Sequence, residues 1–113
     1  MATITFQSDL TGQTDGKQIK VVQTATPGDT IHAAQGIDIV DIFAVNSSSA
    51  AVKLTIEWGE ATAPDGNIEL TIPPESGLVQ VTDRMVIANS LVVKAFASVT
   101  DVIMLSGRYW SAA

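Results

Sequence analysis

The stretch Val52–Trp58, with the sequence VKLTIEW, decides the fold class of this chain. Apolar residues occupy every second position from Val52 to Trp58, and Lys53, Thr55 and Glu57 lie between them. A period of two is typical of a β-strand that turns one face to a core and the other to water. We therefore predict a strand over Val52–Trp58, with Trp58 on its core side.

The segments around this stretch repeat the strand pattern. Asn67–Ile72 shows the same alternation, and the intervening Ala63–Gly66 has turn-forming residues, so the two strands are predicted to form an antiparallel hairpin with a long loop. The runs Ile39–Val45, Leu91–Ala97 and Val102–Leu105 are apolar on both faces. Such runs indicate strands covered on both sides, or strands with one face buried between subunits.

Turn residues recur about every 8–12 positions along the chain, and valine, isoleucine and threonine dominate between them. This spacing predicts an all-β, single-domain fold that is either a sandwich or a barrel, and the period-two runs favour an antiparallel β-sandwich with eight or nine strands and negligible helix. Residues 1–18 are mostly polar and are expected to form an N-terminal strand, over Thr3–Gln7, or an extended arm. Residues 19–113 are expected to form the β-sandwich domain.

Composition removes several classes of function. The chain has 113 residues, 46% of them apolar, which is enough to build one core. Its net charge of -6 disfavours binding to nucleic acid or to an anionic membrane. The chain has no cysteine, which excludes disulfides, thiolate metal sites and cysteine nucleophiles. Neither a secretory leader nor an apolar run long enough for a membrane span is recognisable, so we expect neither a secretory precursor nor a membrane protein.

No motif predicts catalysis or a metal site. The single histidine, His32, would have to serve any Ser-His-Asp triad, but no nucleophile elbow accompanies it, so we interpret it as a surface or interface residue. The loop Asp9–Gly16 resembles a cation loop but has Thr, Gln and Lys where calcium ligands should recur, which favours a solvated loop. Asp38 and Asp41 are three residues apart on a predicted strand and should point to opposite faces.

Glu57 and Glu60 flank Trp58 and could suggest a glycosidase, which holds two carboxyl groups across a cleft. A domain of this size shows no evident cleft, so we interpret both residues as solvated edge charges. Asn46-Ser47-Ser48 matches a glycosylation motif and is interpreted as a polar hairpin turn.

Since none of these motifs predicts catalysis or a metal site, we predict a protein that is not an enzyme and uses no cofactor.

Three aromatic residues leave two interpretations open. Trp58, Tyr109 and Trp110 could form a platform on which a sugar stacks, or they could pack in the core or in an interface. Tyr109 and Trp110 are adjacent near the C-terminus and must point to opposite faces, so at least one of them should be buried.

The order of these pieces resembles that of small all-β structural proteins of tailed-bacteriophage virions. The likeness covers roughly residues 20–110. It rests on Asn46-Ser47 followed by a strand that ends at Trp58-Gly59, and on the turn Pro73-Pro74-Glu75-Ser76-Gly77-Leu78. The resemblance implies a sandwich or jelly roll that coats a capsid, forms a spike, or builds head-tail or tail parts, usually as a symmetric oligomer.

The resemblance therefore implies a capsid decoration or stabilising protein, located in the virion and assembled in the host cytoplasm. Its expected partners are its own subunits, most plausibly in a trimer, and the major capsid protein or another virion protein. A glycan- or host-surface-binding module remains the alternative. Apolar and aromatic residues form the candidate interface: Ile4, Phe6, Leu10, Phe43, Phe96, Tyr109 and Trp110.

Overall fold

The computed structural model describes the backbone of residues 4–112 and the side chains of residues 7–112. The described residues form strands and no helix, so no helix there could cross a membrane. The strands are β1 (Ile4–Asp9), β2 (Ile19–Lys20), β3 (Asp29–Ala33), β4 (Ile37–Asn46), β5 (Val52–Trp58), β6 (Asn67–Ile72), β7 (Val79–Ile87), β8 (Val92–Ala97) and β9 (Ile103–Ala112).

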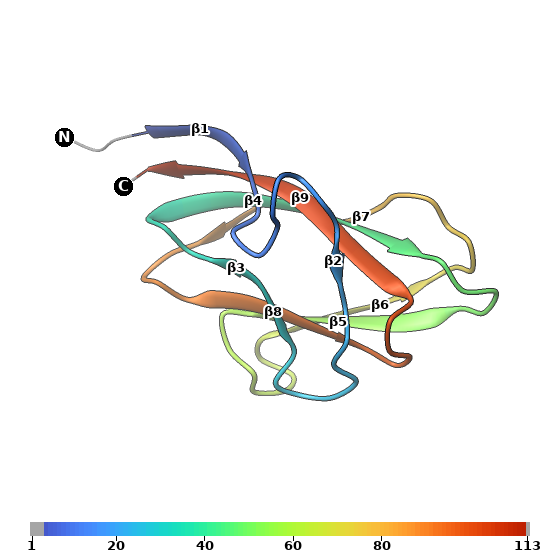
Figure 1. The fold of residues 1–113 in the computed structure, drawn as a ribbon. Helices are drawn as coiled ribbons and strands as arrows, with labels where there is room; N and C mark the ends of the chain where they lie inside the picture. Colours follow the sequence, from blue (N-terminus) through green and yellow to red (C-terminus); the bar gives the residue numbers. More distant parts are fainter. Residues whose placement is uncertain (1–3, 113) are drawn as a thin grey trace.

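The strands form two antiparallel sheets packed as a sandwich (Figure 1). One sheet has the order β1-β9-β4-β7, with β2 also paired to β9, and the other has the order β3-β8-β5-β6. Because most connections pass from one sheet to the other, the order of the strands is jelly-roll-like. The predicted all-β sandwich of eight or nine strands is confirmed.

The predicted hairpin is confirmed residue by residue. β5 pairs with β6 from Val52 opposite Ile72 to Glu57 opposite Asn67, and both strands have the predicted bounds. By contrast, β9 continues well beyond the apolar run that predicted it. The residues after Leu105 include Ser106 and Gly107, which sequence patterns associate with turns, yet β4 pairs with β9 over the full length of both strands.

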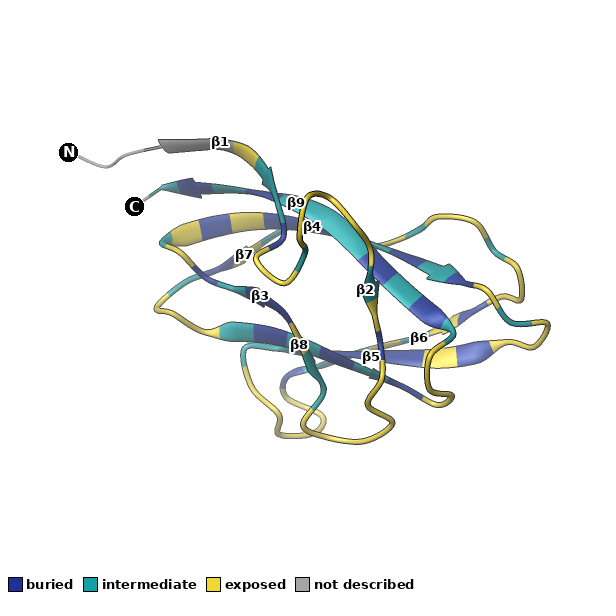
Figure 2. Ribbon diagram, viewed as in Figure 1, coloured by how far each residue is buried: buried dark blue, intermediate teal, exposed yellow. Residues whose placement is uncertain are grey.

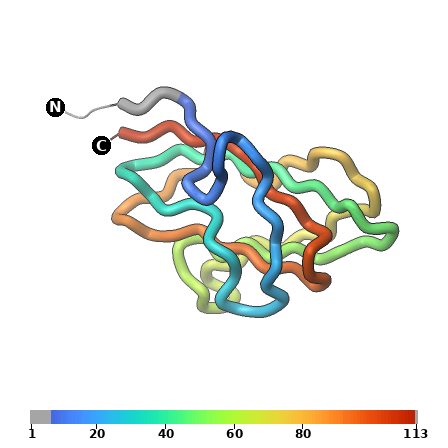
Figure 3. Tube along the Cα trace, viewed as in Figure 1, coloured from blue at the N-terminus to red at the C-terminus, as the bar shows by residue number. Residues whose placement is uncertain are grey.

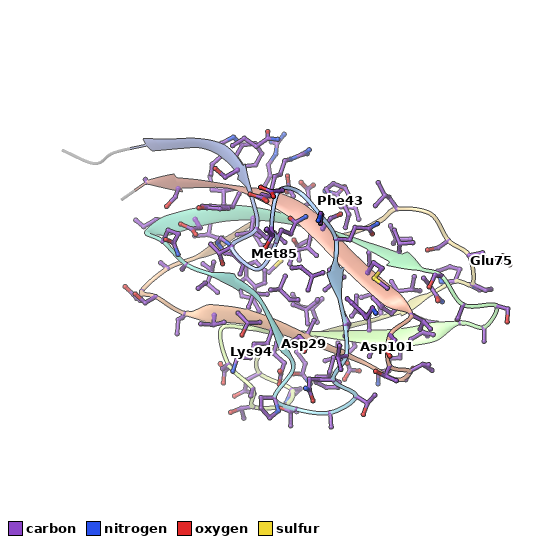
Figure 4. The ribbon with its side chains drawn as sticks, in the orientation of Figure 1. Asp29, Phe43, Glu75, Met85, Lys94 and Asp101 are labelled. Carbon is purple, nitrogen blue, oxygen red and sulfur yellow. The ribbon has the colours of Figure 1, made fainter. Side chains whose placement is uncertain are left out.

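The core lies between the sheets and consists mainly of isoleucine, leucine, valine and alanine side chains. Figure 2 shows the buried residues along the strands and the exposed residues mostly in the loops. Side chains from both sheets fill the space between them (Figure 4). Trp58, predicted on the core side, is partly buried and packs against this core, and its Nε1 donates a hydrogen bond to the Val86 carbonyl at 3.3 Å.

The N-terminal segment pairs with one edge of the sheet that contains β9. β1 and β2 both pair with β9, and the chain between them folds back as a compact loop (Figure 3). In this loop Leu10 is fully buried in the core, and the Gly12 N–H donates to the Ile31 carbonyl at 2.9 Å. Burial in its own subunit removes Leu10 from the candidate interface. The side chains of Ile4 and Phe6, also predicted at the interface, lie outside the described residues, as does Thr3, the predicted start of the first strand.

Candidate functional site

A group of buried, hydrogen-bonded polar side chains surrounds Asp38 in β4. Asp38 is fully buried, and its carboxylate accepts four hydrogen bonds. Oδ1 accepts from the Ser111 hydroxyl at 2.5 Å and from the Gly36 N–H at 3.1 Å. Oδ2 accepts from His32 Nε2 at 2.6 Å and from the Gln35 N–H at 2.9 Å. One carboxylate thus connects β3, the β3–β4 turn, β4 and β9.

His32 is fully buried and extends this network to the N-terminal loop. The Thr11 N–H donates to His32 Nδ1 at 3.2 Å, so Nε2 carries the proton that is donated to Asp38. The Tyr109 ring lies against the imidazole, with 4.4 Å between the ring centroids. The interpretation of His32 as a surface or interface residue is wrong, because β3 turns this residue inward, where Asp38 and Thr11 satisfy both of its nitrogens.

These contacts shift the pKa values of Asp38 and Tyr109. Burial alone would raise the pKa of Asp38. Hydrogen bonds from the Ser111 hydroxyl, the Gln35 N–H and the His32 imidazole outweigh burial, so the pKa of Asp38 lies below its ordinary value. Burial raises the pKa of Tyr109, and the negative charges of Asp38 and Asp9 add to this effect. The network therefore favours a charged Asp38 beside a neutral Tyr109.

This arrangement predicts acid sensitivity of the fold. A carboxyl group whose pKa is lower in the folded state stabilises that state fully above its unfolded pKa, and this contribution is lost as the pH falls through the folded pKa. We expect the free energy of unfolding to fall as the pH drops below about 4, close to the ordinary Asp pKa of 3.8. Urea unfolding at a series of pH values, on wild type and Asp38→Asn, measures it.

In that experiment the stability difference between wild type and Asp38→Asn should shrink as the pH falls. Asn cannot ionise, so only the wild type loses a charged acceptor on acidification. A difference that stays constant from pH 7 to pH 3 would show that the charge of Asp38 does not contribute to stability.

Although Ser111, His32 and Asp38 are the residue types of a hydrolase triad, their order differs from that of a triad. In a triad the histidine lies between the serine and the aspartate and accepts the proton of the serine. Here Asp38 lies between Ser111 and His32 and accepts hydrogen bonds from both. Both Asp38 and Ser111 are at most 2% exposed, so the arrangement ties strands together instead of activating a nucleophile.

A second buried carboxylate, Asp41, lies on the opposite face of β4, as predicted from its spacing to Asp38. Its Oδ1 accepts a hydrogen bond from the Arg84 N–H at 2.6 Å, and its Oδ2 accepts from Arg108 Nε at 3.0 Å. The Arg108 guanidinium also lies over the rings of Phe43 and Trp110, at 5.6 and 5.8 Å from their centroids. The register between β4 and β7 shifts between Thr82 and Met85, so that this part of β7 is irregular. Asp41 holds this part of β7, at Arg84, and the side chain of Arg108 against the sheet.

Glu57 was predicted to be a solvated edge charge, and this prediction is wrong. It is 1% exposed, because the loop between β2 and β3 folds over it. Its Oε1 accepts a hydrogen bond from the Gly28 N–H at 2.7 Å, and its Oε2 accepts from the Thr26 hydroxyl at 2.5 Å. Glu60 is exposed, as predicted. A hollow of about 270 Å³ is lined by both glutamates and Lys94, but the oxygens of Glu57 are already bound to the loop.

The aromatic residues separate as their positions predicted. Tyr109 is 9% exposed and packs inside the chain, whereas Trp110 lies on the outer face of β9 and is partly exposed. Burial removes Tyr109 from the candidate interface and from any sugar platform. Phe43 lies on the outer side of the sheet that contains β9 (Figure 4). Phe96 is partly exposed on β8. Phe43, Phe96 and Trp110 therefore remain candidates for contact with a partner.

In the Asp9–Gly16 loop, which resembles a cation loop in sequence, the aspartate at the start binds the backbone at the end of the loop. Asp9 Oδ2 accepts a hydrogen bond from the Gly16 N–H at 2.9 Å. Within residues 7–112, no group of three or more His, Asp or Glu side chains is placed to hold a metal ion.

Sequence patterns missed the Asp38 network and the Asp41–Arg108 pair. The available signal was an aspartate in the apolar run of β4, since a charged residue there must either face water or find several donors.

Comparison of the chain with protein-family models, with curated proteins and with solved structures found no match.

Proposed function

We propose that this chain is a structural protein of a tailed-bacteriophage virion, most specifically a capsid decoration or stabilising protein. It would join the virion in the host cytoplasm as a symmetric homo-oligomer, with a trimer as the first expectation, and contact the major capsid protein or another virion protein. The proposal rests on the sequence resemblance together with the way in which this sandwich is reinforced.

The observation that best supports the proposal is that three buried carboxylates hold connecting segments and an irregular strand in place. Asp38 secures the β3–β4 turn, Asp41 secures the irregular part of β7, and Glu57 secures the β2–β3 loop, each through backbone N–H groups. Hydrogen bonds from a backbone N–H to a charged acceptor are stronger than neutral ones. Loops held in this way suit a protein that must persist outside the cell without disulfides.

Deletion of the gene in the phage that encodes this chain tests the proposal. Heads should still assemble, but they should release their DNA at a lower temperature than wild-type heads. Addition of the purified protein to the deficient heads should restore the wild-type temperature. Heads that have the same heat resistance with and without the chain, or virions from which the chain is absent, would contradict the proposal.

A glycan-binding module is the second candidate, and one observation favours it. Trp110, Arg108 and Phe43 lie together on an outer sheet face, where an aromatic ring and a guanidinium could contact a sugar. A glycan array decides between the two functions. Binding that is lost in Trp110→Ala, with the fold intact, would favour the module over the decoration protein.

A further inference from the structure

The N-terminal loop, residues 10–18 between β1 and β2, is attached to β3 through Thr11. The Thr11 N–H donates a hydrogen bond to His32 Nδ1 at 3.2 Å, and the Thr11 hydroxyl accepts one from the Ala33 N–H at 2.7 Å. Figure 1 shows the loop beside β3. One of these two bonds therefore ends on a ring nitrogen that can bind a proton.

His32 uses its two ring nitrogens in opposite ways. Nε2 donates to Asp38 Oδ2 at 2.6 Å, and Nδ1 accepts from the Thr11 N–H. An imidazole that takes up a second proton is a donor at both nitrogens and an acceptor at neither. The second proton of His32 belongs on Nδ1, where it meets the Thr11 N–H, which is also a donor. Protonation therefore removes the acceptor of Thr11 and sets two donors against each other.

A counter-charge for the protonated imidazole is already in place. A buried charge is costly when it is unpaired, and a neighbouring opposite charge offsets part of this cost. Asp38 is charged, since its pKa lies below its ordinary value, and it contacts the other nitrogen of the ring. The unfavourable contact of the second proton is therefore the Thr11 N–H, which belongs to the loop.

The ionisable side chains in contact with His32 among the described residues, Asp38 and Tyr109, keep their charge state between pH 8 and pH 5. The pKa of Asp38 is lowered and that of Tyr109 is raised. From β1 the negative charge of Asp9 acts on Tyr109, and on β8 the residue paired with His32 is Val93, which has no ionisable group. His32 is the single histidine of the chain, and imidazole is the side chain that ordinarily titrates in this range.

We propose that protonation of His32 releases the N-terminal loop from β3, so that the attachment of this loop depends on pH. In the attached state the Thr11 N–H occupies the place of the second proton, whereas in the released state Nδ1 is free to bind it. Because the proton binds the released state and not the attached state, a fall in pH shifts the equilibrium towards release. The inference goes beyond the proposed function and does not rest on it, since it concerns contacts within one subunit.

Amide hydrogen exchange of the full-length chain, followed by NMR at pH 8 and pH 5.5, tests the proposal. Exchange rates divided by the intrinsic rate at each pH give the opening equilibrium of each amide. The opening equilibrium of the Thr11 amide should rise about 10-fold at pH 5.5, as expected for one imidazole that titrates near pH 6.5 in the released state. The amide of Leu54, in the centre of β5, should open at least about 10-fold less often than that of Thr11 at both pH values, because the sandwich stays folded.

Two variants separate the titration of His32 from the packing of the loop. The side chain in His32→Gln has an acceptor and a donor but does not titrate, so the opening of Thr11 should be the same at both pH values. Leu10→Ala is the matched control, because it weakens the packing of the loop and keeps the histidine. Its Thr11 amide should open more often at both pH values and retain the 10-fold rise.

The ¹⁵N NMR signals of the His32 ring in wild type give a second measurement that holds if His32→Gln does not fold. Nδ1 should be unprotonated at pH 8 and should gain its proton with the same midpoint as the change at Thr11. A Thr11 amide that opens equally at both pH values in wild type, or an equal pH dependence in His32→Gln, would overturn the proposal. Equal opening of Thr11 and Leu54 would also overturn it, since the proton would then unfold the whole domain.

Discussion

A chain that begins at Lys17 is expected to be unfolded at 25 °C. The deletion removes β1 and also Leu10, which is fully buried in the core. It removes the Thr11 N–H that satisfies His32 and the Gln13 side chain, whose Oε1 accepts from the Gly107 N–H at 3.1 Å. The loss of Leu10 alone should cost about 2–5 kcal/mol, and a domain of this size is stable by about 5–15 kcal/mol. Circular dichroism and urea unfolding measure the outcome.

Leu10→Ala in the full-length chain is the control for this truncation. It should leave the protein folded but less stable by about 2–5 kcal/mol, since only one core side chain is shortened. A truncated chain that unfolds cooperatively with wild-type stability would contradict the prediction. It would show that residues 1–16 behave as an arm that is not required by the sandwich.

Replacement of Asp38 by Ala should destabilise the fold by about 3–5 kcal/mol. The substitution leaves the Ser111 hydroxyl, His32 Nε2 and two backbone N–H groups without their acceptor inside the sandwich. Each buried donor that loses its acceptor costs about 1–3 kcal/mol, and the substitution leaves four such donors. Thermal unfolding should show a fall in melting temperature of more than about 12 °C.

Ser111→Ala provides the matched comparison, because it removes one of the four donors and leaves the carboxylate with three. A loss of about 1 kcal/mol is expected, well below the effect of Asp38→Ala. Equal effects of the two substitutions would mean that the serine bond carries the network. A negligible effect of Asp38→Ala would mean that water replaces the carboxylate, contrary to its complete burial.

The strands with alternating polar residues were the most predictable part of the fold. β5 and β6 have the predicted bounds because every second residue is apolar, and that pattern fits only one pairing of core and solvent faces. β9 was predicted only up to Leu105, although it extends to Ala112. Ser106 and Gly107 have little strand propensity of their own, and pairing with β4 along the whole strand overrides it.

The environment of each charged residue was much less predictable. Glu57 alternates like a solvent-facing residue of β5, but the β2–β3 loop, which is distant in sequence, covers it. His32 gave no sign of burial, because its acceptor lies six residues away across a turn and its second donor lies in the N-terminal loop. Local patterns specify the face on which a side chain lies, whereas its neighbours depend on which loops fold over that face.

The amino-acid sequence by itself determined that this protein is an all-β sandwich, because the period-two runs and their turns are local properties of the chain. It also determined that Tyr109 and Trp110 point to opposite faces. Only the tertiary structure decided which of the two is buried, and that Leu10 belongs to the core of its own subunit. Tertiary structure alone also placed Ile37, Ile39, Val86 and Trp110 on one uncovered surface, since these residues meet only through pairing between strands far apart in sequence.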